Sequence, residues 1–305
     1  MTALEAFFDR LVDYAGLFPP ALLSMGESID QYEQARSGNY TWILGRFICP
    51  ASRLPEFHET VRSTVPLSII IETPHDAREW FDATKTQIES LAPLAPACFE
   101  IRLPEPVALR ENFDPNIAQL AALLRKAGLA EVPVFVELPR TGRWSELLDS
   151  GMRALSRANL RAKIRCGGAT RNDFPSSANI ADFIAASKEY GVPFKATAGL
   201  HHPVRHRDQR SGSAMHGFLN IVGAAVFANS AGFSRERLIA VLDEEDSDAF
   251  TFAGEQFTWR SHHAPTSSIA ATRRELFTAY GSCSFTEPIA DLQSLGILRP
   301  HDLPV

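Results

Sequence analysis

The sequence predicts an α/β fold in which a parallel β-barrel is surrounded by helices. Short apolar segments alternate with amphipathic helical segments through the middle of the chain, a pattern typical of βαβ units. The alternation repeats about every 30 residues, which favours a closed barrel over an open doubly wound sheet. No Gly-x-Gly-x-x-Gly follows the first predicted strand, which argues against a dinucleotide-binding fold. We therefore expect a TIM-like (β/α) barrel whose last third is less regular.

The apolar and β-branched segments place the predicted strands at residues 42–49, 66–73, 98–103, 132–138, 160–166 and 192–197. The segments with helical period between them place the predicted helices at residues 51–63, 76–91, 116–127, 144–158 and 179–190.

Beyond Gly199 the alternation gives way to a different pattern, which begins with a polar loop at residues 201–212. Ser234 is a suitable N-cap for a helix over residues 235–242. Further helices are expected at residues 214–230, 268–280 and 287–295, and a hairpin of two short strands at residues 250–252 and 256–260. Since no segment has the composition of a linker, we expect one domain, residues 1–305, whose terminal segments decorate the open end of the barrel.

The composition narrows the classes of function. The net charge of -6 argues against a nucleic-acid partner. The four cysteines are scattered, so that neither a disulfide framework nor a zinc knuckle is indicated. No apolar run approaches the ~20 residues of a membrane span, and the acidic N-terminal segment differs from a signal peptide. We expect a cytoplasmic protein without a membrane partner or a cofactor, and a homo-oligomer remains compatible with the sequence.

Basic side chains gather on two neighbouring predicted strands. Lys163 and Arg165 are two residues apart on one strand, and Lys195 and Thr197 are two residues apart on the next. Because side chains alternate along a strand, each pair shares a face, and the apolar residues between them would pack against helices. Ligands of parallel α/β folds bind at the carboxyl ends of the strands, where these side chains are expected.

Acidic residues fall on the other predicted strands. Glu72 ends one strand, Glu100 and Arg102 share a face of the next, and Glu137 lies near the end of a fourth. Buried lysines are rare unless they are paired, so these glutamates are candidate partners. One interpretation of the whole set is therefore a structural layer of ion pairs.

Glycines follow the strands that carry the basic residues. Gly167, Gly168 and Gly199 would let backbone N–H groups approach an anion closely. Together with the lysines and Arg165, they predict a small anionic ligand that carries a phosphate or a carboxylate.

Lys195 is also a candidate nucleophile. A lysine buried beside another cation has a lowered pKa, and a neutral amine can form a Schiff base with a carbonyl compound. In this hypothesis Lys163 or Arg165 lowers the pKa of Lys195, while Glu137 or His201 moves protons. The residues then expected to bind substrate are Arg165, Arg102, Gly167, Gly168, Thr197, Gly199, His202 and Glu72.

The segment Phe194-Lys195-Ala196-Thr197-Ala198-Gly199 resembles the Lys-Thr-Ser-Thr-Gly and Lys-Ala-Ser-Gly-Gly strands of deoxyribose-phosphate aldolases. In that family one lysine forms the Schiff base and a second lysine, one strand away, tunes it. The resemblance implies that Lys195 and Lys163 are such a pair, although Lys195 follows Lys163 where the family has the reverse order. The whole chain resembles a bacterial α/β-barrel family whose members share the sequence segments at residues 13–20, 195–203 and 281–285.

Three functions remain open at this point. The first is an enzyme of the lyase/aldolase or isomerase type that acts on a small anionic carbonyl compound through Lys195. The second is a metal-dependent hydrolase or isomerase that uses His201 or His202 with a glutamate at a strand end. The third is a protein that binds an anionic ligand without catalysis.

Overall fold

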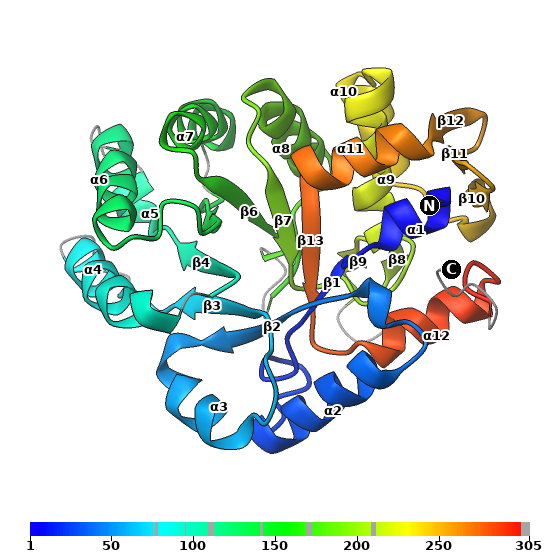
Figure 1. The fold of residues 1–305 in the computed structure, drawn as a ribbon. Helices are drawn as coiled ribbons and strands as arrows, with labels where there is room; N and C mark the ends of the chain where they lie inside the picture. Colours follow the sequence, from blue (N-terminus) through cyan, green and yellow to red (C-terminus); the bar gives the residue numbers. More distant parts are fainter. Residues whose placement is uncertain are drawn as a thin grey trace.

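The computed structural model describes residues 1–74, 76, 79–94, 96–108, 113–140, 143–168, 173–208 and 212–299. In this part of the chain eight parallel strands form a closed barrel with helices around it (Figure 1). The barrel strands are β1 (Val12–Tyr14), β2 (Leu44–Pro50), β3 (Leu67–Ile71), β4 (Cys98–Arg102), β5 (Val134–Glu137), β6 (Arg161–Arg165), β7 (Phe194–Thr197) and β13 (Phe277–Ser282). The predicted TIM-like (β/α) barrel is therefore confirmed.

The barrel closes through its first and last strands. β1 pairs with β13 in the register Asp13↔Gly281, and its other edge pairs with β2. β13 in turn lies beside β7, where Gly281 is the partner of Thr197. The N-terminal and C-terminal parts of the chain therefore complete the same sheet.

The helices cover the outside of the barrel. The larger ones are α2 (Met25–Ser37), α3 (Leu54–Thr60), α4 (Trp80–Leu91), α6 (Phe113–Lys126), α7 (Trp144–Ala158), α8 (Ser177–Glu189), α9 (Phe218–Ala231), α10 (Arg235–Leu242), α11 (Thr266–Glu275) and α12 (Thr286–Ser294). The shorter ones are α1 (Ala3–Phe8) and α5 (Glu105–Ala108). Within the described ranges, no helix has the length and apolar character that a membrane crossing requires.

Local sequence signals fix several helix ends. α2 begins with a capping box. The side chain of Ser24 accepts a hydrogen bond from the backbone N–H of Glu27, and the carboxylate of Glu27 accepts one from the backbone N–H of Ser24. Ser234 caps α10 as predicted. The predicted helix 76–91 corresponds to α4, which begins at Trp80. Residues 77–78 of this predicted helix and residues 209–211 of the predicted polar loop lie outside the described residues.

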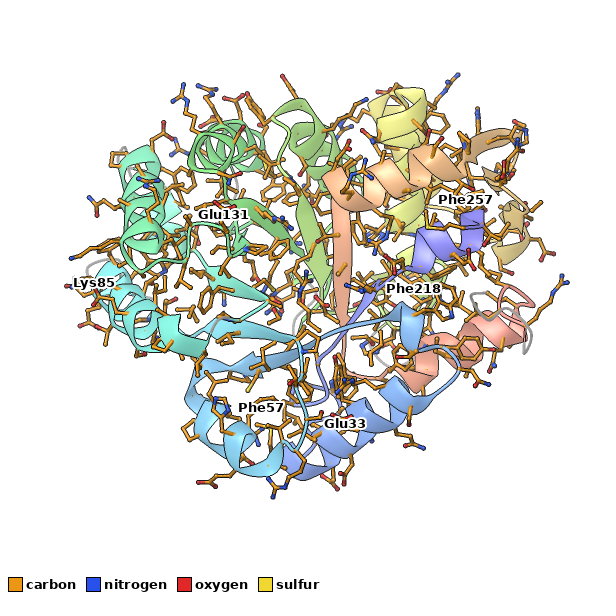
Figure 2. All side chains as sticks on the ribbon, viewed as in Figure 1. Glu33, Phe57, Lys85, Glu131, Phe218 and Phe257 are labelled. Carbon is orange, nitrogen blue, oxygen red and sulfur yellow. The ribbon has the colours of Figure 1, made fainter. Side chains whose placement is uncertain are left out.

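Side chains alternate between the helices and the barrel interior. Phe194 of β7 packs edge-on against Phe183 of α8, with ring centroids 5.1 Å apart. Tyr280 of β13 stacks on Phe218 of α9 at 5.3 Å, in the region labelled in Figure 2. Because these residues face outward, their neighbours Lys195 and Gly281 face inward, as the strand period predicts.

The last third adds a small antiparallel sheet outside the barrel. It consists of β10 (Phe250–Ala253), β11 (Gln256–Trp259) and β12 (His262–Pro265), of which the first two form the predicted hairpin. Phe7 of α1 contacts Phe252 and Phe257 of this sheet, so the sheet lies beside the N-terminal helix (Figure 1). Two further short strands, β8 (His206–Arg207) and β9 (Ala214–Met215), pair with each other.

Two predicted segments were assigned wrongly, and one strand was missed. The helix expected at residues 268–280 ends at Glu275, and β13 follows, because Phe277–Ser282 is rich in residues that favour a buried strand. The helix expected at residues 214–230 begins at Phe218, after β9. No strand was predicted at Val12–Tyr14, since three residues are too few to show an alternation.

Gly167 and Gly199 bring the ends of β6 and β7 together. A Cβ atom on Gly199 would lie 2.9 Å from the carbonyl oxygen of Cys166, and one on Gly167 would lie 2.8 Å from the Cα atom of Gly199. Gly199 also has a φ of +70°, a left-handed conformation that favours glycine. The two strand ends can therefore approach this closely only with glycine at both positions.

Gly199→Ala should destabilise the protein by about 1–3 kcal/mol, because the new Cβ atom meets backbone and the conformation is strained. Gly26→Ala in α2 is the matched control, since a Cβ atom there has nothing within 4 Å. The control should be neutral or stabilising by up to about 1 kcal/mol. Urea denaturation measures both free energies of unfolding, and equal values would contradict this account.

Candidate active site

A buried lysine lies at the centre of the barrel. The Nζ atom of Lys195 is 2.6 Å from Oδ2 of Asp13 and 2.7 Å from Oε1 of Glu100. The three residues come from β7, β1 and β4, which are not neighbours in the sheet, so these contacts cross the barrel interior. Lys195 and Asp13 are 0% exposed.

A second lysine shares the same carboxylate. The Nζ atom of Lys163 lies 2.9 Å from Oε2 of Glu100 and 3.0 Å from Oε2 of Glu137. Glu100 therefore bridges Lys163 and Lys195, with one oxygen toward each. Lys163 is 6% exposed, so it lies closer to solvent than Lys195.

Two arginines continue these contacts toward the carboxyl end of the barrel, which we call the mouth. Oε1 of Glu137 lies 3.3 Å from Nε of Arg165 and 3.9 Å from Nε of Arg102. Their side chains are 44% and 58% exposed, respectively, whereas that of Glu137 is only 7% exposed. The contacts thus lead from a fully buried lysine to two guanidinium groups that a ligand can reach.

Other polar groups hold the carboxylates in place. Ser68 donates a hydrogen bond of 2.6 Å to Oε1 of Glu100, and the Cys98 thiol donates to the Ser68 hydroxyl. On the other side, the backbone N–H and guanidinium of Arg46 both donate to Asp13. We call the set of Asp13, Arg46, Glu100, Arg102, Glu137, Lys163, Arg165 and Lys195 the charged network.

The glutamates of the charged network are held in their ionised form. Burial alone would raise the pKa of Glu100, but the positive charges of Lys163 and Lys195 outweigh it and lower the pKa. The pKa of Glu137 is lowered in the same way, against its burial, by Lys163 and Arg165.

The prediction that Lys195 has a lowered pKa is wrong. Burial acts in that direction, but the carboxylates of Asp13 and Glu100 outweigh it and raise the pKa. The pKa of Lys163 is raised for the same reason, with Glu100 and Glu137 as its partners. Strand spacing placed the cations close together, but it did not show that a carboxylate lies between them.

Most of the other predicted site residues lie at the strand ends near the charged network. Thr197 is the register partner of both Arg165 and Gly281, so it belongs to the same interior face. Gly167 and Gly168 follow β6, and a side chain at Gly168 would collide with Asp173.

Glu72 does not pair with either lysine, contrary to expectation. Its carboxylate accepts a hydrogen bond from the backbone N–H of Ser52, and its backbone N–H donates to the side chain of Gln87. It lies beyond the end of β3, where it fixes the loop that follows β2.

The two predicted histidines face a different element. Nδ1 of His201 lies 3.1 Å from Glu287, and Nδ1 of His202 lies 2.7 Å from Asp291, so both contact carboxylates of α12. Neither contact includes Glu72 or Glu137. Among the described residues, no group of three or more His, Cys, Asp and Glu side chains is arranged to hold a metal ion.

The sequence analysis missed Asp13, Ser68 and Arg46. Asp13 lies between Val12 and Tyr14, so an acidic residue flanked by apolar ones was the only available signal. Ser68 interrupts a β-branched strand and could have been recognised as a polar residue on its inner face.

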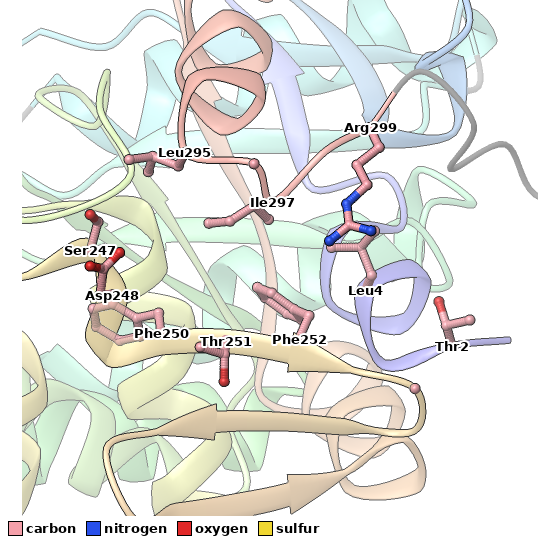
Figure 3. Close-up of a pocket in the computed structure, with 12 residues that line it drawn as sticks. Thr2, Leu4, Ser247, Asp248, Phe250, Thr251, Phe252, Leu295, Ile297 and Arg299 are labelled. Atoms are coloured by element: carbon pink, nitrogen blue, oxygen red, sulfur yellow. The ribbon is translucent and has the colours of Figure 1, made fainter.

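A separate cavity of about 530 Å³ lies between β10, the start of the chain and the segment after α12 (Figure 3). Phe250, Phe252, Leu295 and Ile297 form its apolar walls, and Arg299 lies at its edge. None of the predicted site residues lines this cavity, so we do not treat it as the candidate active site.

Comparison with solved structures shows the same fold. The chain resembles the deoxyribose-phosphate aldolase from Aeropyrum pernix, which is described as a tetramer, with a TM-score of 0.52 and 12% identity over 96% of this chain and 98% of that one. It also resembles a "putative deoxyribose-phosphate aldolase" from Toxoplasma gondii ME49, with a TM-score of 0.54 and 10% identity over 96% and 94%. The sequence matches no family model and no curated protein. These likenesses establish the barrel fold, and they involve the family that the Lys195 segment resembles.

Glu100→Gln should destabilise the protein by about 3–5 kcal/mol, because it leaves two buried lysines without a shared carboxylate. The folded-state pKa of Glu100 lies below the ordinary value of 4.5, so its contribution is present above about pH 4.5 and is lost as the pH falls further. The variant should therefore show a weaker loss of stability on acidification, as measured by urea denaturation at several pH values.

Glu33→Gln is the matched control, since Glu33 of α2 pairs with Arg36, accepts a hydrogen bond from Ser63 and has a side chain that is 38% exposed (Figure 2). It should change stability by no more than about 1 kcal/mol. An unchanged acid dependence in Glu100→Gln would contradict the role given to this carboxylate.

Proposed function

We propose that the protein is an enzyme of the lyase/aldolase type that forms a Schiff base with a small anionic carbonyl compound. The observation that carries this proposal is the pair of lysines that share Glu100, beneath two arginines that are exposed at the mouth. The arginines supply a site for the anionic group, and the lysines supply an amine. The likeness in fold to aldolases supports the same class of chemistry.

Burial favours Lys163 as the nucleophile and Lys195 as its partner, the reverse of the roles expected from the sequence. Lys163 is adjacent to Glu137, which contacts the exposed arginines. Lys195 lies on the other side of Glu100 and is 0% exposed. A substrate that enters through the mouth meets Lys163 first. Lys195 then serves to keep Glu100 ionised and in position beside Lys163.

The first chemical step follows from these contacts. The Lys163 ammonium passes a proton to Glu137, its hydrogen-bonding partner at 3.0 Å. The neutral amine attacks the carbonyl carbon. The carbonyl oxygen takes one proton from the nitrogen and one from Glu137 and leaves as water, so that an iminium ion remains on Lys163. The iminium nitrogen then accepts the electron pair of a nearby C–C bond, while a hydroxyl on the departing carbon gives its proton to Glu137 and becomes the carbonyl group of the released product.

The complete pairing of Lys195 favours a second candidate function. A fully buried lysine with two carboxylate partners is also what a structural layer of ion pairs requires. In that case Arg102 and Arg165 would hold an anion at the mouth without catalysis.

Reductive trapping separates the two candidates. Treatment of the full chain with a panel of small carbonyl compounds and sodium cyanoborohydride should reduce the imine to a stable secondary amine on Lys163. Mass spectrometry of the peptides identifies the modified lysine in the wild-type protein, so the result does not depend on a variant that may not fold. Lys85, exposed on α4 (Figure 2), provides the internal measure of non-specific labelling.

Preferential labelling of Lys163 over Lys85 would support the proposed enzyme. Labelling of Lys195 alone would reverse the roles of the two lysines. If neither lysine is labelled above the level of Lys85 by any compound, the Schiff-base proposal is wrong, and anion binding without catalysis is favoured.

A further inference from the structure

We infer that the substrate of this site is a 2-oxo acid, in which a carboxylate is bonded directly to the reacting carbonyl carbon. The inference rests on the proposed function, since it assumes that Lys163 attacks a carbonyl group. It goes further because it fixes the kind of anionic group and its distance from the carbonyl carbon.

Glu137 shows the size of the group that fits between the arginines and the amine. One oxygen of its carboxylate lies 3.3 Å from Nε of Arg165, and the other lies 3.0 Å from Nζ of Lys163. A single planar carboxylate therefore spans the space between the guanidinium and the amine. A substrate carboxylate on Arg165 has its neighbouring carbon next to Lys163.

The two arginines at the mouth carry more positive charge than the Glu137 carboxylate balances. Arg102 and Arg165 share a single oxygen of Glu137, at 3.9 and 3.3 Å, and both side chains are substantially exposed. Guanidinium groups bind planar carboxylates with two parallel hydrogen bonds, and two guanidiniums offer more donors than Glu137 uses. A second carboxylate can therefore bind both arginines without leaving a buried charge unpaired.

The chain length of the substrate follows from this geometry. In a 2-oxo acid the carbonyl carbon is one bond away from the carboxylate, which matches the separation that Glu137 spans. In a sugar phosphate, an ester oxygen and at least one further carbon separate the phosphorus from the carbonyl carbon. With its phosphate on Arg165, such a compound would place its carbonyl carbon beyond Lys163.

Binding of the substrate carboxylate also prepares the amine. When it binds Arg165 beside Glu137, the positive charge of Arg165 is shared between two carboxylates, so Glu137 becomes a better proton acceptor. The proton of the Lys163 ammonium moves to Glu137, and the amine adds to the ketone carbon. The ketone oxygen takes one proton from the nitrogen and one from Glu137, and departs as water. The positive iminium ion then lies beside Glu100, which balances its charge.

Pyruvate and acetaldehyde are a matched pair of probes, because pyruvate carries a carboxylate where acetaldehyde carries a hydrogen. The full wild-type chain is treated with sodium cyanoborohydride and equal concentrations of pyruvate, acetaldehyde or dihydroxyacetone phosphate, and the initial rate of Lys163 modification is measured by mass spectrometry. We expect pyruvate to label Lys163 at least about tenfold faster than either other probe, since it gains charge-assisted hydrogen bonds to the arginines.

Arg165→Gln should lower the ratio of pyruvate labelling to acetaldehyde labelling by about tenfold to a hundredfold, because only pyruvate has a carboxylate that binds the guanidinium. Arg102→Gln, at the more exposed position, should act in the same direction and serves if the first variant fails to fold. Arg235→Gln is the control, because Arg235 of α10 pairs with Asp182 of α8, neither of which belongs to the charged network, and it should change neither rate.

The outcomes distinguish this inference from the function on which it rests. Labelling of Lys163 by acetaldehyde or dihydroxyacetone phosphate at least as fast as by pyruvate would overturn the 2-oxo acid and retain the Schiff base. An Arg165→Gln variant that keeps the preference for pyruvate would also overturn it. If no probe labels Lys163 or Lys195 specifically, the proposed function itself is wrong.

Discussion

The Glu100 carboxylate is the constraint on which the site depends. It lies between two buried ammonium groups, each of which would cost several kcal/mol to remove from water without a partner. The hydroxyl of Ser68 donates to the oxygen that contacts Lys195, which fixes the orientation of the carboxylate. Charge alternates from Asp13 to Arg165 around this carboxylate, because each of the two buried lysines has an anion on either side.

The barrel makes this arrangement possible. Parallel strands in register place Lys163 beside Lys195, while closure of the sheet brings β1 and β4 within reach of β7. The approach of Gly167 to Gly199 draws the same two strand ends together. The fold thus concentrates charge at the bottom of the site and leaves the arginines exposed at its mouth, where the proposed anionic substrate would bind.

The sequence predicted the barrel, most of its strands and the inward direction of Lys163, Arg165 and Lys195, because these depend on strand period and spacing. It also named Glu100 and Glu137 as candidate partners of the lysines, which the contacts confirm, but it could not predict which lysine each of them meets or the part of Asp13. Asp13 lies on a strand of three residues that shows no period, and its partner Lys195 is 182 positions away in the sequence. The direction of the Lys195 pKa shift depends on those contacts, so it was predicted with the wrong sign. The contacts of His201 and His202 with α12 were missed for the same reason.

Carboxylates hold both lysines in their charged form in the free protein. Titration of the protein labelled with ¹³C at the lysine Cε atoms, followed by NMR, tests it most directly. In the absence of carbonyl compounds, the signals of Lys163 and Lys195 should keep the shift of a charged amine beyond the ordinary pKa of 10.5. Titration of either signal below that value would contradict the account, because it would mean that the carboxylates do not outweigh burial.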